Sequence, residues 1–301
     1  MNKVTIPYYT QLTPETALFA KAVRYFYIAI MYYTYLLLFV FGLFGGFIGG
    51  LIGIGGGILF VLILPAVLTS LGVLDAEIAQ YVVANSLFAI FFSSLTSSIS
   101  LFKDKNVYPR EVLIIGLVSI ITATLVLKGF VNTDYYDKAK FNIIVIGLMA
   151  FMLYRTLMSA RKNDANSFKI LNNKQLGTIG LVSGMVAPLS GLGGGIVIIP
   201  ILNGIHKMQV RFANSISLGV IGITSLWTTI LNLFEEPKSQ IESYSIGYIV
   251  FPVALTLAAG VIIASPFGVK ASKKIKPTTI NYIFGLFIVI SMLRKLWEIF
   301  M

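Results

Sequence analysis

The sequence predicts an all-α, polytopic integral membrane protein built from two similar halves. Of its 301 residues, 57% are hydrophobic and only 12% are charged, and its mean hydropathy is +0.87. Water-soluble domains carry about a quarter charged residues, so a soluble globule is excluded. Several apolar runs of about 20 residues follow one another without alternating strand patterns, which favours membrane helices over barrel strands. A glycine-rich run occurs twice, which predicts an internal duplication.

Composition also restricts the chemistry. The chain has no cysteine and a single histidine, His206. Disulfides, thiolate or histidine metal sites and covalent haem are therefore excluded, and we expect no cofactor and no metal. The net charge of +11 comes from basic residues in short loops between apolar runs. Membrane topology and anionic lipid headgroups explain this charge better than nucleic acid does, with attraction of an anionic substrate as a smaller contribution.

The first half is predicted to cover residues 25–160, after an N-terminal extension of residues 1–24. Its first apolar run extends from about Tyr25 to Gly50 and ends in glycines. Consecutive glycines have a high entropy cost in a helix, so the run predicts a helix break. A run at 58–71, too short to cross a bilayer, completes a re-entrant hairpin or discontinuous helix. Three spanning helices are then expected at 79–102, 111–130 and 141–157.

The second half repeats this order. A basic linker at 161–174 precedes a repeat that covers residues 175–301. Its glycine-terminated run (177–195) and short return (196–205) are followed by spans expected at 212–234, 244–268 and 278–296. If neither hairpin crosses, each half has three crossings and the second half is inverted. Basic loops on the cytoplasmic side then place both termini outside, unless the first run also spans and returns the N-terminus to the cytoplasm.

The two glycine runs are in register, and they carry the predicted chemistry. Aligning Gly53 on Gly191 also superimposes both glycine triplets. Broken backbone inside a bilayer is tolerated where it is buried in protein or lines a wet cavity. Freed N–H groups and a following helix N-terminus favour an anion. Close helix packing is the alternative, but it does not explain two triplets in register. The predicted substrate-binding glycines are Gly53, Gly55, Gly56, Gly57, Gly191, Gly193, Gly194 and Gly195.

A second repeated pattern follows each triplet. An Ala-Asn-Ser sequence supplies Asn85 and Ser86 in the first half, and Asn214 and Ser215 in the second. Small or hydroxyl residues recur after each Asn at offsets that fall on one helix face. They could donate hydrogen bonds to an oxyanion along a path, or bond between helices, and for the stripes the two explanations weigh equally. The predicted pathway-lining residues are Ser93, Thr96, Ser100, Ser225 and Thr229.

Charged residues are nearly absent from the predicted spans. Asp75, Glu77 and Arg211 all fall near predicted ends. A proton pump with a buried carboxylate is therefore disfavoured. An intramembrane enzyme is disfavoured as well, because no nucleophile–base pair or carboxylate dyad is visible at depth.

The duplicated glycine motif, followed by apolar residues, a proline and an Ala-Asn-Ser helix start, resembles the TauE/SafE family of membrane permeases, also called the sulfite exporter family. The resemblance covers about residues 36–296. It implies transport of small sulfur-containing or organic anions, such as sulfite, thiosulfate, sulfoacetate or other sulfonates, across the cytoplasmic membrane, with both glycine motifs handling substrate. The halves differ: Pro200 has Leu62 as its counterpart, and Ala187-Pro188 replaces Gly49-Gly50.

These observations predict a multi-pass anion transporter of the cell membrane that works by alternating access around the two glycine breaks. Its expected partners are a small anionic substrate and the lipid bilayer. A passive anion channel, a permease for a non-sulfur organic anion and a structural subunit are the alternatives. A homodimer is one oligomeric state that the sequence leaves open.

Overall fold

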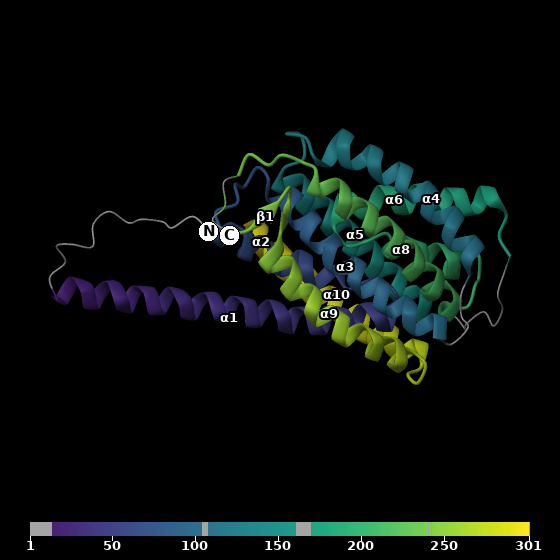
Figure 1. Cartoon of the computed structure of the whole chain (residues 1–301). Coiled ribbons are helices and arrows are strands. Elements are labelled where there is room, and N and C mark those ends of the chain that lie inside the picture. Colours follow the sequence, from purple (N-terminus) through teal and green to yellow (C-terminus); the bar gives the residue numbers. More distant parts are fainter. Residues whose placement is uncertain (1–13, 104–107, 161–169, 240, 242, 301) are drawn as a thin grey trace. The chain divides into compact units, whose positions relative to one another are not determined.

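A computed structural model describes residues 14–103, 108–160, 170–239, 241 and 243–300 (Figure 1). The chain divides into two compact units, residues 1–37 and 38–301. Helix α1 (Pro14–Ile52) begins in the first unit, well before the expected start at Tyr25. The predicted N-terminal extension and the basic linker lie largely outside the described residues.

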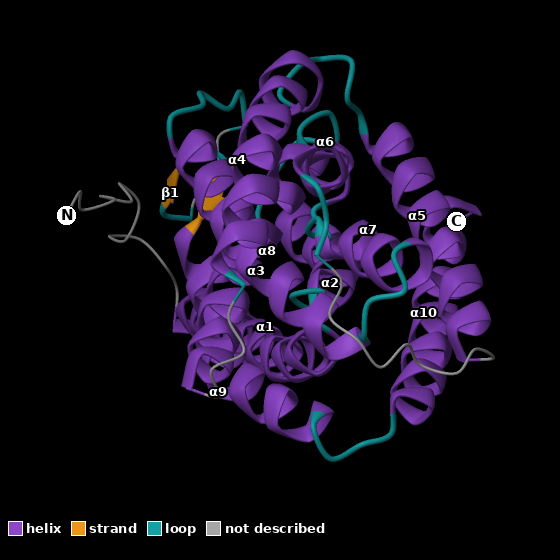
Figure 2. Cartoon of the chain, turned by 90° about the vertical axis from the view of Figure 1, so that its right-hand side faces the viewer, coloured by secondary structure: helices purple, strands orange, loops and turns teal. Residues whose placement is uncertain are grey.

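The described chain is almost entirely helical, as predicted (Figure 2). After α1 the elements are α2 (Gly57–Ser70), α3 (Ile78–Lys103), α4 (Pro109–Val126), the π-helix η1 (Leu127–Val131), α5 (Lys138–Ala160), α6 (Asn173–Ser190), α7 (Gly195–Pro200), the π-helix η2 (Ile201–Ile205), α8 (Val210–Leu233), the strands β1 (Ser245–Ile246) and β2 (Ile249–Val250), α9 (Phe251–Ser272) and α10 (Pro277–Phe300).

Seven of the described helices are long and apolar enough to cross a membrane. They include the C-terminal part of α1, Met31–Ile52; five of the others match predicted spans, and the sixth, Phe251–Ser272, overlaps the span predicted at 244–268. The apolar helices after the glycine breaks, Gly57–Ser70 and Gly195–Ile205, are shorter, as expected. The protein is therefore a multi-pass α-helical membrane protein.

The span predicted at 244–268 begins too early. Its first residues form a two-stranded hairpin instead, with Ser245 paired to Val250. Gly247 turns the hairpin at a φ of +55°, a conformation that glycine adopts without a steric penalty. Pro252 then stands in the first turn of α9, where its missing N–H costs nothing.

Small residues let α1 and α6 approach neighbouring helices closely. A β-carbon placed on Gly42 would lie 2.6 Å from the Leu257 carbonyl oxygen of α9. In the second half, a β-carbon on Gly184 would lie 2.5 Å from the Ser119 carbonyl oxygen of α4. These glycines serve helix packing. Each half's broken helix thereby packs on a long helix of the other half.

Helices α3 and α8 pack on each other in antiparallel directions. A β-carbon on Gly222 would lie 3.3 Å from the Ser94 hydroxyl oxygen, while Leu101 shares a buried cluster with Leu218. Residue numbers thus rise along α3 as they fall along α8. This pairing supports the predicted inversion of the halves, which itself stays a prediction.

A candidate anion site at two helix breaks

Both broken helices end in the same local structure. The Gly53 N–H donates to the Gly49 carbonyl over 2.8 Å, and the Gly191 N–H donates to the Ala187 carbonyl over 3.0 Å. The φ angles of Gly53 and Gly191 are +86° and +63°, in the left-handed region. A left-handed glycine with this hydrogen bond is a common helix terminator. The predicted helix breaks are confirmed, and the last glycine of each triplet begins the next helix.

The first break leaves backbone donors without an acceptor. Helix α2 begins at Gly57, and the Leu59 N–H donates to the Gly56 carbonyl over 3.2 Å. Among the described residues, the structure records no acceptor for the N–H groups of residues 55–58, which precede the helix's own ladder. The 14-residue α2 adds the positive end of its dipole. In the second half α7 continues directly into η2, so the helix that follows the second break spans Gly195–Ile205.

The two breaks lie against each other. A β-carbon placed on Gly57 would lie 2.7 Å from the Leu192 Cα, and one on Gly195 would lie 3.0 Å from the Gly53 carbonyl oxygen. These contacts run in opposite directions along the two segments. The structure therefore brings the predicted glycines of both halves into one buried cluster.

A serine from each half donates a hydrogen bond to a glycine carbonyl at the break of the other half. The Ser86 hydroxyl of α3 donates to the Gly191 carbonyl over 2.5 Å, and the Ser217 hydroxyl of α8 donates to the Gly53 carbonyl over 2.9 Å. The sequence pointed to Ser215, which is buried in α8, and missed Ser217. Two positions along a helix change the face on which a side chain lies. The glycine register alone could not have revealed this shift.

The two predicted asparagines lie in different surroundings. Asn85 Nδ2 donates to the Tyr81 and Tyr248 carbonyls over 2.7 and 3.0 Å, and Asn85 Oδ1 accepts from the Val250 N–H over 2.9 Å. In this conformation Asn85 therefore holds the hairpin before α9 rather than facing the breaks. Asn214 does face a break, since a β-carbon on Gly53 would lie 2.9 Å from the Asn214 Cγ.

The predicted pathway hydroxyls are mostly bonded within the protein. Ser93 pairs with the Ser265 hydroxyl of α9 at 2.8 Å. Thr96, Ser100 and Ser225 each donate to a carbonyl one turn earlier in their own helix. Thr229 is buried, and its hydroxyl has no partner among the described residues. In this conformation the stripes mainly satisfy their own helices, while Ser86 and Asn214 contact the breaks.

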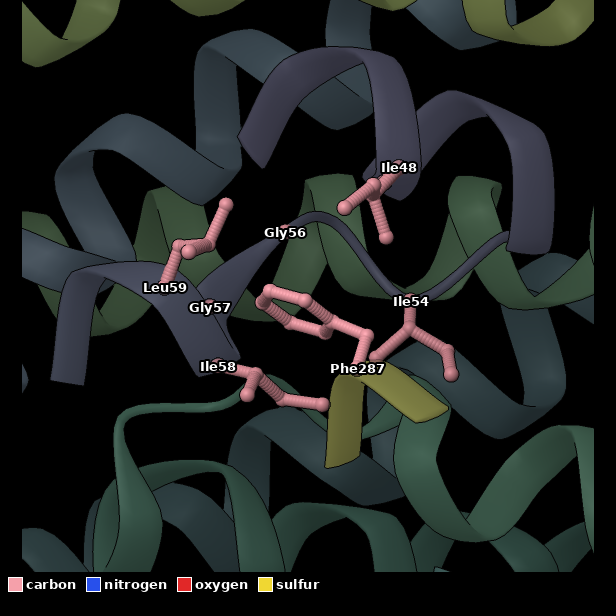
Figure 3. Close-up of a pocket in the computed structure, with 8 residues that line it drawn as sticks. Ile48, Ile54, Gly56, Gly57, Ile58, Leu59 and Phe287 are labelled. Carbon is pink, nitrogen blue, oxygen red and sulfur yellow. The ribbon is translucent and has the colours of Figure 1, made fainter. Parts of the chain in front are cut away.

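A small pocket opens beside the first break (Figure 3). Its lining is almost entirely apolar and consists of three glycines, Gly49, Gly56 and Gly57, together with Ile48, Ile54, Ile58, Leu59 and Phe287. It has room for about one water molecule. Phe287 of α10, which the sequence did not single out, lies beside Gly57, so glycines of the first break and an aromatic ring line one pocket.

The structure buries charged side chains whose contacts the sequence did not predict, among them Lys295 and Glu77. Lys295 of α10 is fully buried, and its ammonium lies 5.6 Å from the centre of the Phe141 ring. Lys295 is therefore one of the few charged residues within the predicted spans, and it is buried. Glu77, just before α3, accepts hydrogen bonds from the backbone N–H groups of Lys238 and Ser239 over 2.8 and 2.7 Å. Both charges became visible only once the helices were packed.

The electrostatics around Glu77 affect a neighbouring tyrosine. Burial, followed by the nearby Glu77 carboxylate, raises the pKa of Tyr248 above its ordinary value. The Tyr248 hydroxyl therefore keeps its proton at neutral pH. Among the described residues, no group of three His, Cys, Asp or Glu side chains could hold a metal ion.

A multi-pass helical bundle in which two discontinuous helices meet at a buried site has the architecture of a secondary membrane transporter. The chain belongs to the TauE/SafE sulfite exporter family, whose model matches residues 38–294. A probable membrane transporter protein of Methanocaldococcus jannaschii is 33% identical over 80% of this chain and 87% of its own length. Probable membrane transporter proteins of Haemophilus influenzae and Bacillus subtilis are 26% and 24% identical, over 97% and 98% of their lengths. The protein is a membrane permease of this family.

Proposed function

We propose that this permease is a carrier for small sulfur-containing or organic anions, such as sulfite, thiosulfate, sulfoacetate or another sulfonate, in the cell membrane. The observation that carries the proposal is the first glycine break, where unpaired backbone N–H groups, the N-terminus of α2 and an apolar pocket coincide. The family description, sulfite exporter, agrees with an anionic sulfur substrate. No catalytic step is assigned to the chain.

The binding chemistry follows from the donors at the first break. The N–H groups of residues 55–58 would donate to the anionic oxygens, and the dipole of α2 would stabilise the charge. Hydrogen bonds to a charged group are roughly twice as strong as neutral ones. Ser86 and Ser217 would not bind the anion, because their hydroxyls hold the glycine carbonyls. They would keep the break in shape while the substrate binds.

The size of the pocket supports alternating access. A sulfonate does not fit a space that holds about one water molecule. Phe287 or the break itself must therefore move before the anion can enter, and we propose that this movement alternates between the two membrane sides. A passive anion channel is the alternative. It would need a continuous open path rather than a closed pocket.

The test is counterflow in proteoliposomes that contain the purified full-length protein. Vesicles are preloaded with excess unlabelled sulfite, thiosulfate, sulfoacetate or, as a non-sulfur comparison, lactate, and a trace of the same labelled anion is added outside. A carrier gives transient accumulation of label above equilibrium, whereas a channel only equilibrates it. Protein-free vesicles are the control. If the label accumulates only with lactate, the substrate is a carboxylate rather than a sulfur anion. If it accumulates with none of the anions, the proposal is contradicted.

A further inference from the structure

The C-terminal end of α1 is rich in hydrogen-bond acceptors. In its last turn, the Gly49 carbonyl accepts from the Gly53 N–H over 2.8 Å. For the carbonyls of residues 50–52 the structure records no donor among the described residues, and they lie past the end of the helical ladder. The helix dipole concentrates partial negative charge at this end. A cation is the ligand that such an end favours.

Asn214 adds a side-chain oxygen at the same place. A β-carbon on Gly53 would lie 2.9 Å from the Asn214 Cγ and 3.0 Å from its Cα, so the side chain packs directly on the residue that ends α1. The Asn214 Oδ1 atom is enclosed by protein and accepts no hydrogen bond from any described residue. Leaving a buried acceptor unpaired is costly, so this oxygen can accept a hydrogen bond from a ligand or coordinate a cation.

The second break lacks both features. Val83 occupies the matching place, since a β-carbon on Gly191 would lie 3.1 Å from the Val83 Cα. The Tyr136 hydroxyl donates to the Leu189 carbonyl in the last turn of α6. Burial raises the pKa of Tyr136, so this hydroxyl keeps its proton and remains a donor. At the end of α6 the protein therefore supplies a hydrogen-bond donor, the Tyr136 hydroxyl. At the end of α1 the neighbouring side chain is Asn214 instead.

We propose that the last-turn carbonyls of α1 and Asn214 Oδ1 bind one monovalent cation, with Na⁺ as the favoured ion. Neutral oxygen ligands without a carboxylate suit a hard ion of single charge. Helix C-termini and unwound carbonyls coordinate Na⁺ in other discontinuous transporter helices. The cation would lie at one end of the break and the anion at the other, so each would strengthen binding of the other. This coupling rests on the proposed anion carrier, whereas the cation site does not.

The experiment measures ion binding by the purified full-length protein, without any anionic substrate. Melting temperatures are compared in NaCl, KCl and choline chloride at equal ionic strength, together with equilibrium binding of ²²Na⁺. We expect saturating Na⁺ to raise the melting temperature by about 3 °C relative to choline. About one Na⁺ should bind per chain, because the proposed ligands, the last-turn carbonyls of α1 and Asn214 Oδ1, surround one ion.

Three variants separate the site from a general salt effect. Asn214→Val places a valine beside Gly53, as Val83 stands beside Gly191 at the second break. It should abolish the rise in melting temperature that Na⁺ causes. Asn214→Asp keeps the oxygen, adds a charge and should tighten Na⁺ binding at least tenfold, which also controls for misfolding. Asn142→Val is the matched control, because Asn142 of α5 also has an enclosed Oδ1 atom without a partner among the described residues. It should leave the response unchanged.

Equal melting temperatures in all three salts would overturn the cation site and leave a buried water as the ligand. The same conclusion would follow if Asn214→Val still bound Na⁺, or if Asn142→Val abolished binding. Counterflow of a sulfur anion could still succeed in each of those cases. Conversely, the protein can bind Na⁺ even if it transports none of the tested anions. The ion-binding measurement therefore tests the cation site alone, and counterflow tests the anion carrier alone.

Discussion

The aligned glycines Gly56 and Gly194 are predicted to respond very differently to alanine. Gly56 has a φ of +82°, and an added β-carbon would lie 2.2 Å from the Gly45 carbonyl oxygen. The left-handed backbone costs about 1–2 kcal/mol and the overpacking about 1–3 kcal/mol, so Gly56→Ala should lose about 2–5 kcal/mol. Gly194 has a φ of −68°, and its β-carbon would lie 3.0 Å from Ser183. There the strain is offset by about 0.4–1 kcal/mol of unfolded-state entropy, so the net change should stay within about 1 kcal/mol.

The assay is the melting temperature of detergent-purified variants. At about 2 °C per kcal/mol, Gly56→Ala should melt about 4–10 °C below the wild type, and Gly194→Ala within about 2 °C of it. Gly147→Ala in α5 is the control, since an added β-carbon there meets nothing within 4 Å. It should be neutral or slightly stabilising. Equal decreases in melting temperature for Gly56→Ala and Gly194→Ala would refute the reasoning. They would mean that an added β-carbon is equally unfavourable at both breaks.

Three further predictions concern residues around the breaks. Ser86→Ala leaves the Gly191 carbonyl without its donor and should lower the melting temperature by about 3 °C; an unchanged value would mean that water replaces the hydroxyl. Phe287→Ala should enlarge the pocket, so larger sulfonates should compete better against sulfite in counterflow, and identical selectivity would argue against a substrate contact. Glu77→Gln removes an anionic acceptor, so hydrogen exchange at the Ser239 N–H should quicken about tenfold, while an unaltered rate would contradict the contact.

Local chain properties were enough to predict most of the fold. The hydropathy of each long run places a helix wherever about 20 apolar residues must satisfy their backbone in lipid. The glycine runs predict breaks because the cost of helical glycine and its access to positive φ are properties of the residue itself, and Gly53 and Gly191 end their helices accordingly. The hairpin at 245–250 was missed because its apolar residues have the hydropathy of a helix, and a side chain from α3 holds it.

The candidate site shows where sequence reasoning ends. The register of the glycines predicted that the two breaks form one site. In the structure the two breaks are in contact. The identical Ala-Asn-Ser segments did not predict that Asn85 would hold a hairpin while Asn214 packs on Gly53. A conformational preference belongs to one residue and its neighbours in the chain, whereas a hydrogen-bond partner depends on how distant helices are rotated and packed. The sequence by itself therefore determined the membrane helices and their breaks, and only the tertiary structure decided which polar groups meet there.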